Sequence, residues 1–252
     1  MKSHFEIRPE ERLDDLQLQD LYILQKVKGF RFGLDAVLLA DFAQIRPHEK
    51  TVDLGTGTGI LPLLLYGREP SAVFDAVELQ SDMADMAARS VRGNGLEDSI
   101  RIHCHDVRGI RTLLPCGAYS LVICNPPYEP QNALQMPETD ALRTAKMETE
   151  CTLQDIAQAA KWLLKNGGRL CLCLPSKRMA EAFETLKKVR IEPKRLRLVH
   201  TQIDRPARLI LLEGCLNGQP GLSVLPPLIV KNENGQDSAE IKRIYHIEES
   251  KS

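Results

Sequence analysis

The sequence lacks the features that mark secreted, membrane-spanning and zinc-binding proteins. Its apolar runs are all shorter than the about 18 residues that a membrane-spanning helix needs, and its first fifteen residues carry too many charges for a signal peptide. Seven cysteines are scattered along the chain without a CxxC pair. We therefore expect reduced thiols in a cytoplasmic protein that has no membrane contact and no disulfide framework.

An overall excess of charge is also missing, since the formal net charge is −1 over 252 residues. Cations nevertheless gather between residues 187 and 208, where eight basic residues stand against two acidic ones, Glu192 and Asp204. The basic residues are Lys187, Lys188, Arg190, Lys194, Arg195, Arg197, Arg205 and Arg208. This local excess would allow the segment, with Lys194, Arg195 and Arg197 at its centre, to bind the phosphates of RNA. A solvated surface of helix and loop would explain the same charges.

The apolar pattern favours one α/β unit. The chain is 43% hydrophobic and 27% charged, an ordinary balance for a globular protein, and short apolar runs alternate with amphipathic segments. The runs predict strands over residues 51–55, 72–79, 99–105, 119–125, 169–175, 194–200 and 207–213. The amphipathic segments predict helices over 59–67, 81–95, 153–168 and 177–189, with Ser81 and Thr152 as N-caps. This alternation is typical of βαβ units around a parallel sheet.

The two ends of the chain differ from this pattern. Residues 18–30 and 35–43 read as two helices joined by the letters RFGL. Near the other end, two extended pieces flank Asn234-Gly235, which is a strong hairpin signal. We therefore expect three parts. They are an N-terminal helical extension (1–45), a core (46–222) and a C-terminal extended or hairpin segment (223–252).

A glycine-rich loop follows the first predicted core strand. Gly55, Gly57 and Gly59 stand in the letters VDLGTGTG, so the backbone can approach a ligand closely at the start of a helix. The dinucleotide fingerprint GxGxxG requires a third glycine where this chain has Ile60. That difference disfavours a dinucleotide oxidoreductase. Asp53, which precedes the first glycine, tightens the loop for a smaller ligand without a pyrophosphate.

Polar residues end the next three strands in turn: Glu78, Asp106 and Asn125. Ligands of open α/β sheets bind at the carboxyl ends of the strands. A carboxylate such as that of Glu78 can accept hydrogen bonds from both hydroxyls of a ribose, although alone it could equally be a solvated strand end. The coincidence of four strand ends is more specific than any one of them.

The letters VICNPPYEP (122–130) place Asn125 before two prolines, which fix two φ angles and remove two backbone donors. A strand that simply stops at a proline turn would show the same letters. The long segment 129–151 that follows suggests a cover for the substrate.

The letters DLGTGTG, together with Glu78 and Asp106, resemble the class I S-adenosylmethionine-dependent methyltransferases. NPPY is similar to the catalytic motif of amino-methyltransferases that act on adenine N6 or on glutamine of release factors. The resemblance implies a seven-stranded, mostly parallel sheet with helices on both faces. It implies that the cofactor contacts Asp53, Gly55, Thr56, Gly57, Gly59, Glu78, Leu79, Asp106 and Asn125.

The NPPY chemistry follows from the weakness of an exocyclic amine as a nucleophile. The side-chain oxygen of Asn125 and the carbonyl of Pro126 can accept its two N–H groups, while Pro127 stiffens the turn and Tyr128 stacks on a flat substrate. The sulfonium methyl is already activated, so neither a metal nor a strong base is needed.

The likeness extends over nearly the whole chain. The letters at 30–42, 52–65, 77–96, 124–128, 191–200 and 240–248 resemble the bacterial tRNA1(Val) adenine-37 N6-methyltransferase family. This chain departs from the letters of that family at Glu129 and at 145–148, beside the substrate segment. The resemblance implies methylation of adenine 37 in a tRNA.

Two other functions remain open. A release-factor glutamine methyltransferase would use the same NPPY letters, but usually has a large N-terminal helical domain, whereas about 50 residues precede the glycine loop here. A non-catalytic RNA-binding module would have no need of NPPY. The residues do not indicate an oligomeric state.

Several other residues have simple structural explanations. His103 and His105 share a strand face, but no third residue completes a metal site, so we expect ordinary strand histidines. Cys171 and Cys173 are expected in the core, as is Trp162. Asp35 could close the cofactor site or cap the helix that follows it.

Overall fold

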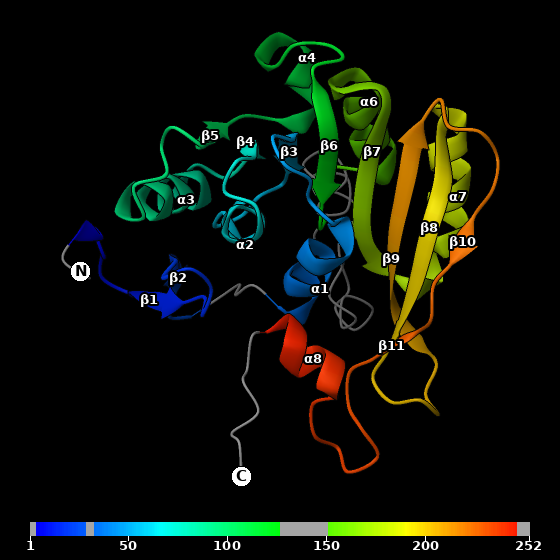
Figure 1. Cartoon of the computed structure of the whole chain (residues 1–252). Coiled ribbons are helices and arrows are strands. Elements are labelled where there is room, and N and C mark those ends of the chain that lie inside the picture. Colours follow the sequence, from blue (N-terminus) through cyan, green and yellow to red (C-terminus); the bar gives the residue numbers. More distant parts are fainter. Residues whose placement is uncertain (1–3, 29–32, 127–150, 246–252) are drawn as a thin grey trace, which may run out of the picture.

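The computed structural model describes residues 4–28, 33–126 and 151–245 of the chain. A large sheet lies at the centre with helices on both faces, and a small two-stranded hairpin lies to one side (Figure 1). The strands are β1 (Glu11–Asp15), β2 (Tyr22–Lys26), β3 (Lys50–Leu54), β4 (Val73–Glu78), β5 (Ile100–Cys104), β6 (Tyr119–Cys124), β7 (Leu164–Pro175), β8 (Ile191–His200), β9 (Ala207–Leu216), β10 (Ser223–Val224) and β11 (Leu228–Ile229). The α-helices are α1 (Leu34–Ala43), α2 (Ile60–Arg68), α3 (Ser81–Gly93), α4 (Ile110–Leu113), α6 (Leu153–Leu163), α7 (Met179–Lys188) and α8 (Ala239–Ile244).

The large sheet has the order β10-β8-β9-β7-β6-β3-β4-β5, and β11 also pairs with β8. Only β9 runs against its neighbours, β7 and β8. The prediction of a mostly parallel sheet is confirmed, but the predicted number of seven strands is wrong, because the sheet has nine. The two extra strands are short pieces beside Pro226 that pair with β8, and they show too few residues for an alternating pattern.

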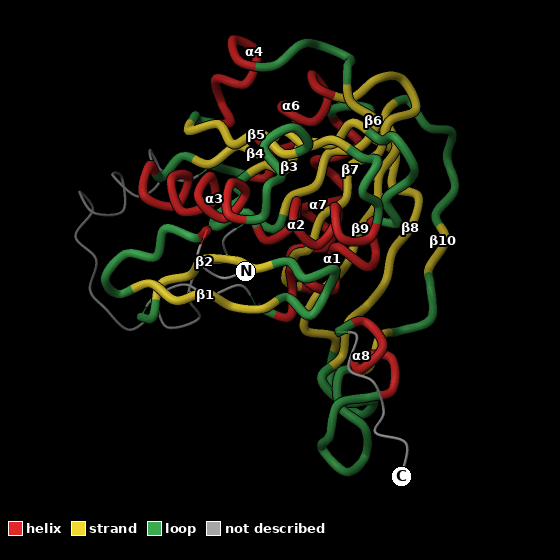
Figure 2. The backbone as a smooth tube through the Cα atoms, turned by 60° about the vertical axis from the view of Figure 1, so that its left-hand side comes forward, coloured by secondary structure: helices red, strands yellow, loops and turns green. Residues whose placement is uncertain are grey.

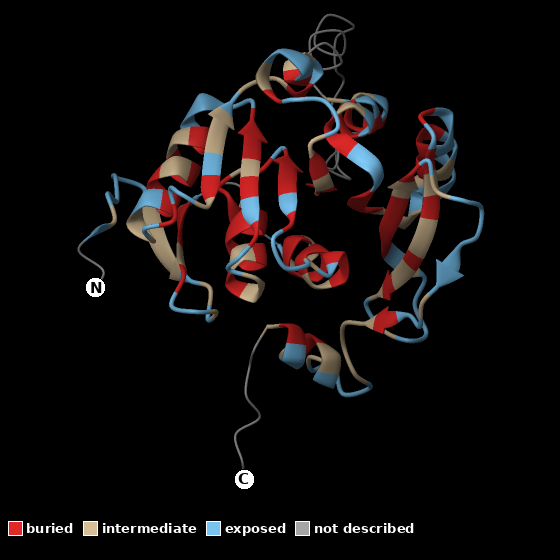
Figure 3. Ribbon diagram, turned by 45° about the horizontal axis from the view of Figure 1, so that its top comes forward, coloured by how far each residue is buried: buried red, intermediate tan, exposed pale blue. Residues whose placement is uncertain are grey.

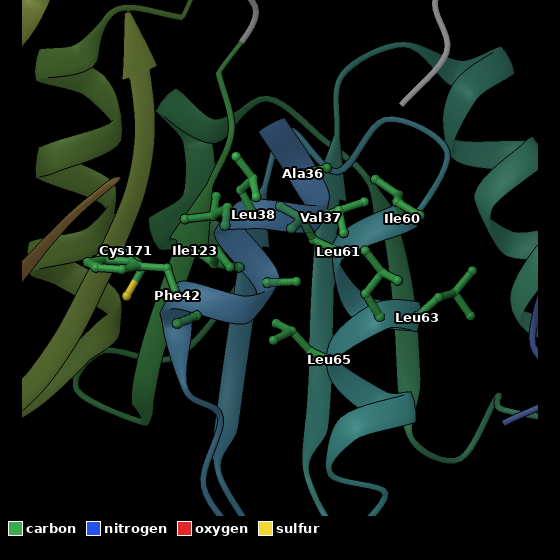
Figure 4. Close-up of a cluster of buried hydrophobic side chains, with 14 of the residues drawn as sticks. Ala36, Val37, Leu38, Phe42, Ile60, Leu61, Leu63, Leu65, Ile123 and Cys171 are labelled. Carbon is green, nitrogen blue, oxygen red and sulfur yellow. The ribbon is translucent and has the colours of Figure 1, made fainter. Parts of the chain in front are cut away.

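Each face of the sheet carries its own apolar core. One core lies between the sheet and α1, α2 and α3, where Leu38, Leu65 and Ile123 are almost completely buried (Figure 4). The other lies beneath α4, α6 and α7. Figure 3 shows the central strands largely buried on both faces. Burial of each large apolar side chain contributes about 1.5–3 kcal/mol relative to its exposed state, so these two cores fix the strand ends in space.

The N-terminal helix predicted over 18–30 is wrong, because residues 22–26 form β2 and pair antiparallel with β1. Gln17, Gln19 and Asp20 adopt left-handed backbone angles that turn the chain between the strands. The hairpin lies against α3 (Figure 2), where Leu24 N–H donates to Ser90 Oγ at 2.9 Å. The second predicted helix, 35–43, is confirmed as α1.

The C-terminal segment also differs from its prediction. The turn at Asn234-Gly235 is present and is closed by an antiparallel bridge between Lys231 and Asp237. The chain then forms α8 rather than a second extended piece, because the Ser238 side chain accepts a hydrogen bond from Ile241 N–H at 3.2 Å and caps a helix. The division of the chain at residues 45 and 222 stays a prediction.

Two helix boundaries show how caps decide where a helix begins. Thr152 caps α6 as predicted, with a reciprocal bond between its side chain and Asp155. Ser81 is the first residue of α3 rather than its cap, and Gln80 holds that position without a side-chain bond. Helix α6 ends at Leu163 rather than at residue 168. Within the described residues, none of the helices is both long and apolar enough to cross a membrane.

Candidate cofactor and substrate site

The predicted site residues converge because four neighbouring strands are parallel. Strands β5, β4, β3 and β6 lie side by side in that order, so their carboxyl ends share one edge of the sheet, which we call the carboxyl edge. Asp53 pairs in register with Ala76 and Ile123. Glu78 ends β4, and Asn125 directly follows β6. The structure therefore brings the glycine loop and the two strand-end residues together.

The glycine loop between β3 and α2 has a backbone that only glycine adopts easily. Gly55, Gly57 and Gly59 have φ angles of 74°, 58° and 86°. A β-carbon at Gly59 would also approach the Ala87 side chain within 3.3 Å. Because Gly59 stands directly before α2, this loop brings its backbone and a helix start to the carboxyl edge, while the N–H groups of Gly55 and Thr56 donate to the Val77 carbonyl.

The Glu78 side chain is buried and held in one orientation. Its Oε2 accepts a hydrogen bond from Gly57 N–H at 2.8 Å, and its Oε1 accepts one from Gln80 N–H at 2.9 Å. Each carboxylate oxygen has a second lone pair, so the group can still accept hydroxyl donors. Leu79 follows with half of its surface exposed, which leaves an apolar contact beside that carboxylate.

Asp53 is fully buried. The sequence did not predict this burial or its effect on the pKa of the carboxyl. The pKa of its carboxyl is raised to about 7, chiefly by burial, with Thr56 acting to lower it and the nearby Glu78 acting to raise it. Neither carboxylate oxygen, nor Thr56 Oγ1, makes a hydrogen bond of normal geometry among the described residues. A buried carboxylate without a partner is costly, so the site favours a ligand that brings a cation or an N–H donor.

Asp106 lies at the carboxyl edge but already has a partner. Its Oδ1 accepts a hydrogen bond from Arg108 N–H at 2.8 Å, and its Oδ2 accepts one from Arg108 Nη2 at 2.6 Å. The Arg108 guanidinium lowers the pKa of the Asp106 carboxyl. This pair fixes the turn after β5, at the place where the resemblance expects contact with the cofactor.

The substrate side of the site is described up to Pro126. Asn125 is half-buried and Pro126 is buried, directly beyond β6. Pro127 and Tyr128 lie outside the described residues, as does the segment 129–150, so their predicted roles stay predictions.

The basic segment does not form one surface. Arg195 donates to Glu213 Oε2 at 3.0 Å, and its guanidinium lies over the Phe42 ring at 4.6 Å. Arg197 donates to Glu240 Oε2 at 2.8 Å. Both arginine side chains are largely buried, whereas Lys194 is half-buried and donates to the Gln219 carbonyl at 3.0 Å. RNA contact by these three residues stays a prediction, and the internal partners weigh against the two arginines.

The expectation for the cysteines is confirmed, and that for the histidines holds for His103 in β5 but not for His105, which follows the strand. The His103 Nε2 lies 2.7 Å from Asp75 Oδ1, and the His105 Nε2 lies 3.2 Å from the Gly109 carbonyl. Cys171 and Cys173 are fully buried.

Trp162 is half-buried against the second core and donates its indole N–H to the Leu114 carbonyl at 3.0 Å. Gly33, not Asp35, caps α1. Asp35 lies in the first turn of that helix, where burial raises its carboxyl pKa while the charge of Arg208 lowers it.

Comparison with known proteins places this geometry in a family. Residues 34–194 match the family model of the methyltransferase small domain. The chain belongs to that family. This match extends from α1 into β8 and includes the glycine loop, Glu78 and Asn125.

Curated relatives extend the likeness beyond that domain. A protein of Erwinia tasmaniensis named tRNA1(Val) (adenine(37)-N6)-methyltransferase is 27% identical over 235 residues, which cover 90% of this chain and 91% of that protein. A protein of Musicola paradisiaca with the same name is 30% identical over 67% of each chain. The family resemblance drawn from the sequence motifs is thereby confirmed.

Solved structures support the methyltransferase fold. A predicted O-methyltransferase from Agrobacterium tumefaciens superimposes with a TM-score of 0.70 at 21% identity, covering 84% of this chain and 96% of that one. Geranyl diphosphate C-methyltransferase from Streptomyces coelicolor, in complex with S-adenosyl-L-homocysteine, gives a TM-score of 0.54 at 16% identity, covering 72% and 79% of the two chains. At these identities the likeness establishes the fold alone.

Proposed function

We propose that this methyltransferase transfers the methyl group of S-adenosylmethionine to N6 of an adenine in tRNA, with adenine 37 of the anticodon loop as its target. The observation that carries the proposal is the position of Asn125 and Pro126, one strand away from the glycine loop at the same edge of the sheet. The names of the full-length relatives support the same substrate.

The described residues fit a cofactor with a cationic amino group and a ribose. The buried Asp53 carboxylate lacks a hydrogen-bond partner among the described residues, so it suits an ammonium group, directly or through water. Glu78 is oriented to accept ribose hydroxyls, and Leu79 offers an apolar contact to the adenine. Gly55, Thr56, Gly57 and Gly59 bring backbone close to the ligand, and Asp106 lies farther along the same edge. When bound, the cofactor supplies an activated methyl group.

The residues of the protein contribute to the transfer by holding the reacting amine in position. Asn125 Oδ1 and the Pro126 carbonyl accept the two N–H groups of the exocyclic amine, which directs the nitrogen lone pair toward the methyl group. Pro127 restrains this turn, and the Tyr128 ring stacks on the extruded base. Two fixed acceptors are sufficient for this role, because the amine nitrogen becomes acidic as its new carbon–nitrogen bond replaces the carbon–sulfur bond of the donor, and it can then give its surplus proton to water.

We place the reaction in the cytoplasm, where tRNA is found. All seven cysteines of the chain are free thiols, which suits a reducing compartment.

Methyl transfer to defined acceptors tests the proposal. Purified protein and labelled S-adenosylmethionine are incubated with a tRNA1(Val) transcript, with the same transcript carrying guanine at position 37, and with a release factor. We expect label only in the first RNA, recovered as N6-methyladenosine. Methylated glutamine in the release factor, with unlabelled RNA, would identify the alternative enzyme and overturn the proposal.

A further inference from the structure

The cations of residues 187–208 divide between two opposite edges of the sheet. Strand β9 is antiparallel to both β7 and β8, so β8 runs in the same direction as β7 and β6. Lys187 and Lys188 precede β8 and therefore lie toward the edge opposite the glycine loop. Arg205 follows β8, in the turn before β9, and lies at the carboxyl edge that Asn125 shares.

A second turn reaches the carboxyl edge beside that one. Strand β7 ends at Pro175, which pairs with Leu209 at the start of β9. The Ser176 hydroxyl donates to the Ala207 carbonyl at 2.5 Å and ties the two turns together. Because Cys124 pairs with Leu172, the end of β7 projects about 10 Å beyond the end of β6, at about 3.3 Å for each of three residues. The turn after β7 thus stands one strand away from Asn125 and rises above it, and the turn between β8 and β9 lies farther along the same edge.

These two turns expose an unusual mixture of side chains. Lys177 is exposed and has no ion-pair partner among the residues the structure describes. Arg205 is 67% exposed, and the nearest carboxylate oxygen, of Asp204, lies 3.9 Å from it. Two large apolar side chains near these cations in the sequence are also exposed, Met179 with 39% and Ile203 with 69% of its surface.

The third cation of the two turns, Arg178, is already paired. Its Nη2 donates to Glu181 Oε1 at 2.7 Å. Lys177 and Arg205 are therefore the cations of these turns that remain available for a polyanion.

We infer that Lys177, Met179, Ile203 and Arg205, here called the edge patch, form the docking surface for the RNA strand that flanks the target adenine. Lys177 and Arg205 neutralise backbone phosphates, while Ile203 and Met179 pack on bases that are unstacked when the loop opens. This inference rests on the proposed function and assigns RNA recognition to residues other than the central arginines of β8.

Affinity for RNA as a function of salt tests the charged half of the patch. The probe is a tRNA1(Val) transcript, and the variants are Lys177→Gln with Arg205→Gln and, as a matched control, Lys187→Gln with Lys188→Gln. Each phosphate contact on single-stranded RNA contributes about 0.7 to the slope of log K against log salt. We expect the slope of the patch variant to fall by about 1.4 and that of the control to equal the wild type. Equal slopes for all three proteins, or an equal fall in the control, would overturn the inference.

A second pair of variants tests the apolar half. Ile203→Thr should weaken RNA binding by about 5-fold without changing the salt slope, since the variant loses apolar surface that packs on a base but loses no charge. Val224→Thr, an exposed apolar residue on β10, should bind RNA like the wild type. Unchanged RNA affinity in Ile203→Thr would show that Ile203 does not pack on the RNA.

The same samples separate this inference from the proposed function. If wild-type protein fails to methylate the transcript, the proposed function fails. If it methylates adenine 37 while the patch variant keeps the wild-type slope, only the edge patch fails. Cofactor affinity measured on each variant confirms that the fold is retained.

Discussion

Asn125 is the residue on which the proposed chemistry depends most directly. Asn125→Ala removes one of two acceptors for the reacting amine, so the rate of methyl transfer should fall by about 100-fold or more. Single-turnover methylation of the tRNA transcript measures that rate. Cofactor affinity should not change, because the glycine loop and Glu78 remain. The control is Asn166→Ala, near the start of β7 and away from the carboxyl edge, which should react at the wild-type rate. A wild-type rate for Asn125→Ala would show that the NPPY letters form only a proline turn.

Glu78 links the glycine loop to the proposed ribose site. Glu78→Gln keeps the shape of the side chain but replaces an acceptor oxygen with an amide nitrogen. Affinity for S-adenosylmethionine should fall by about 1–3 kcal/mol, the usual loss for hydrogen bonds to a charged group. Calorimetry gives the affinity directly. The same affinity in wild type and variant, with both proteins folded, would exclude Glu78 as a cofactor ligand.

Asp53 makes a prediction about pH. The pKa of its carboxyl rises from 3.8 to about 7 on folding, so the folded protein holds this proton more tightly between those values. The free energy of unfolding should therefore fall as pH rises from about 4 to 7, by up to about 4 kcal/mol at 1.36 kcal/mol for each pH unit. Asp53→Asn should remove that part of the pH dependence in urea unfolding. Parallel curves for wild type and variant would contradict the assignment.

The same carboxylate predicts how cofactor binding responds to pH. Only the ionised form of Asp53 attracts an ammonium group, so affinity for the cofactor should rise as pH passes upward through about 7. Calorimetric titrations between pH 6 and 8 measure this, at about one unit on either side of that value. In Asp53→Asn the affinity should be lower and should lose this dependence, whereas an equal rise in that variant would assign it to another group.

At the scale of elements, the N-terminal hairpin is held to α3 by a buried ion pair. Arg89 Nη2 donates to Glu11 Oε1 at 2.7 Å, and this bond lowers the pKa of the Glu11 carboxyl. Glu11→Gln should reduce the free energy of unfolding at pH 7 by about 1–3 kcal/mol. Glu97→Gln is the control, because its ion pair with Arg92 is largely exposed and should contribute less than about 1 kcal/mol.

The direction of the Glu11 effect with pH follows from its lowered pKa. The stabilisation is present above the pKa of the unfolded chain and is lost as pH falls through the lower pKa of the folded protein. The difference in unfolding free energy between wild type and Glu11→Gln should therefore shrink below about pH 4. A constant difference across that range would mean that packing, not charge, holds the hairpin to α3.

The sequence predicted the elements whose pattern is local. The strands from β3 to β9 and the helices α2, α3, α6 and α7 show clear periodicity, and Thr152 carries its own cap, so their order was predictable, whereas the four-residue α4 was not predicted. The hairpin was not predicted either, because three turn positions between Leu16 and Leu21 use left-handed Gln and Asp rather than Gly, and because β2 is stabilised by Ser90 and Asn94 at a distant helix. The extra strands β10 and β11 depend in the same way on β8.

The same distinction holds within the site. The glycine loop, Glu78 and Asn125 could be assigned to one edge from the sequence, since parallel strands align their ends. The sequence could not predict the burial of Asp53 or the internal partners of Arg195 and Arg197. These partners, Glu213 and Glu240, are brought near the arginines only by the fold.

At the scale of the whole molecule, the direction of β8 decides at which edge of the sheet the cations before and after it lie. Cations before β8 stay at the edge away from the cofactor loop, whereas those in the turns after β7 and β8 lie at the carboxyl edge. A tRNA would therefore approach from the carboxyl edge, along which the glycine loop, Asn125 and the edge patch are placed.

The most direct test of the central claim is the modification state of position 37 in cellular tRNA. Total tRNA from cells with and without this gene is digested and mapped by mass spectrometry. The account predicts that N6-methyladenosine at position 37 of one tRNA is present in the first sample and missing in the second, and that a plasmid copy of the wild type restores it whereas Asn125→Ala does not. An unchanged level of N6-methyladenosine at that position after loss of the gene would contradict the account.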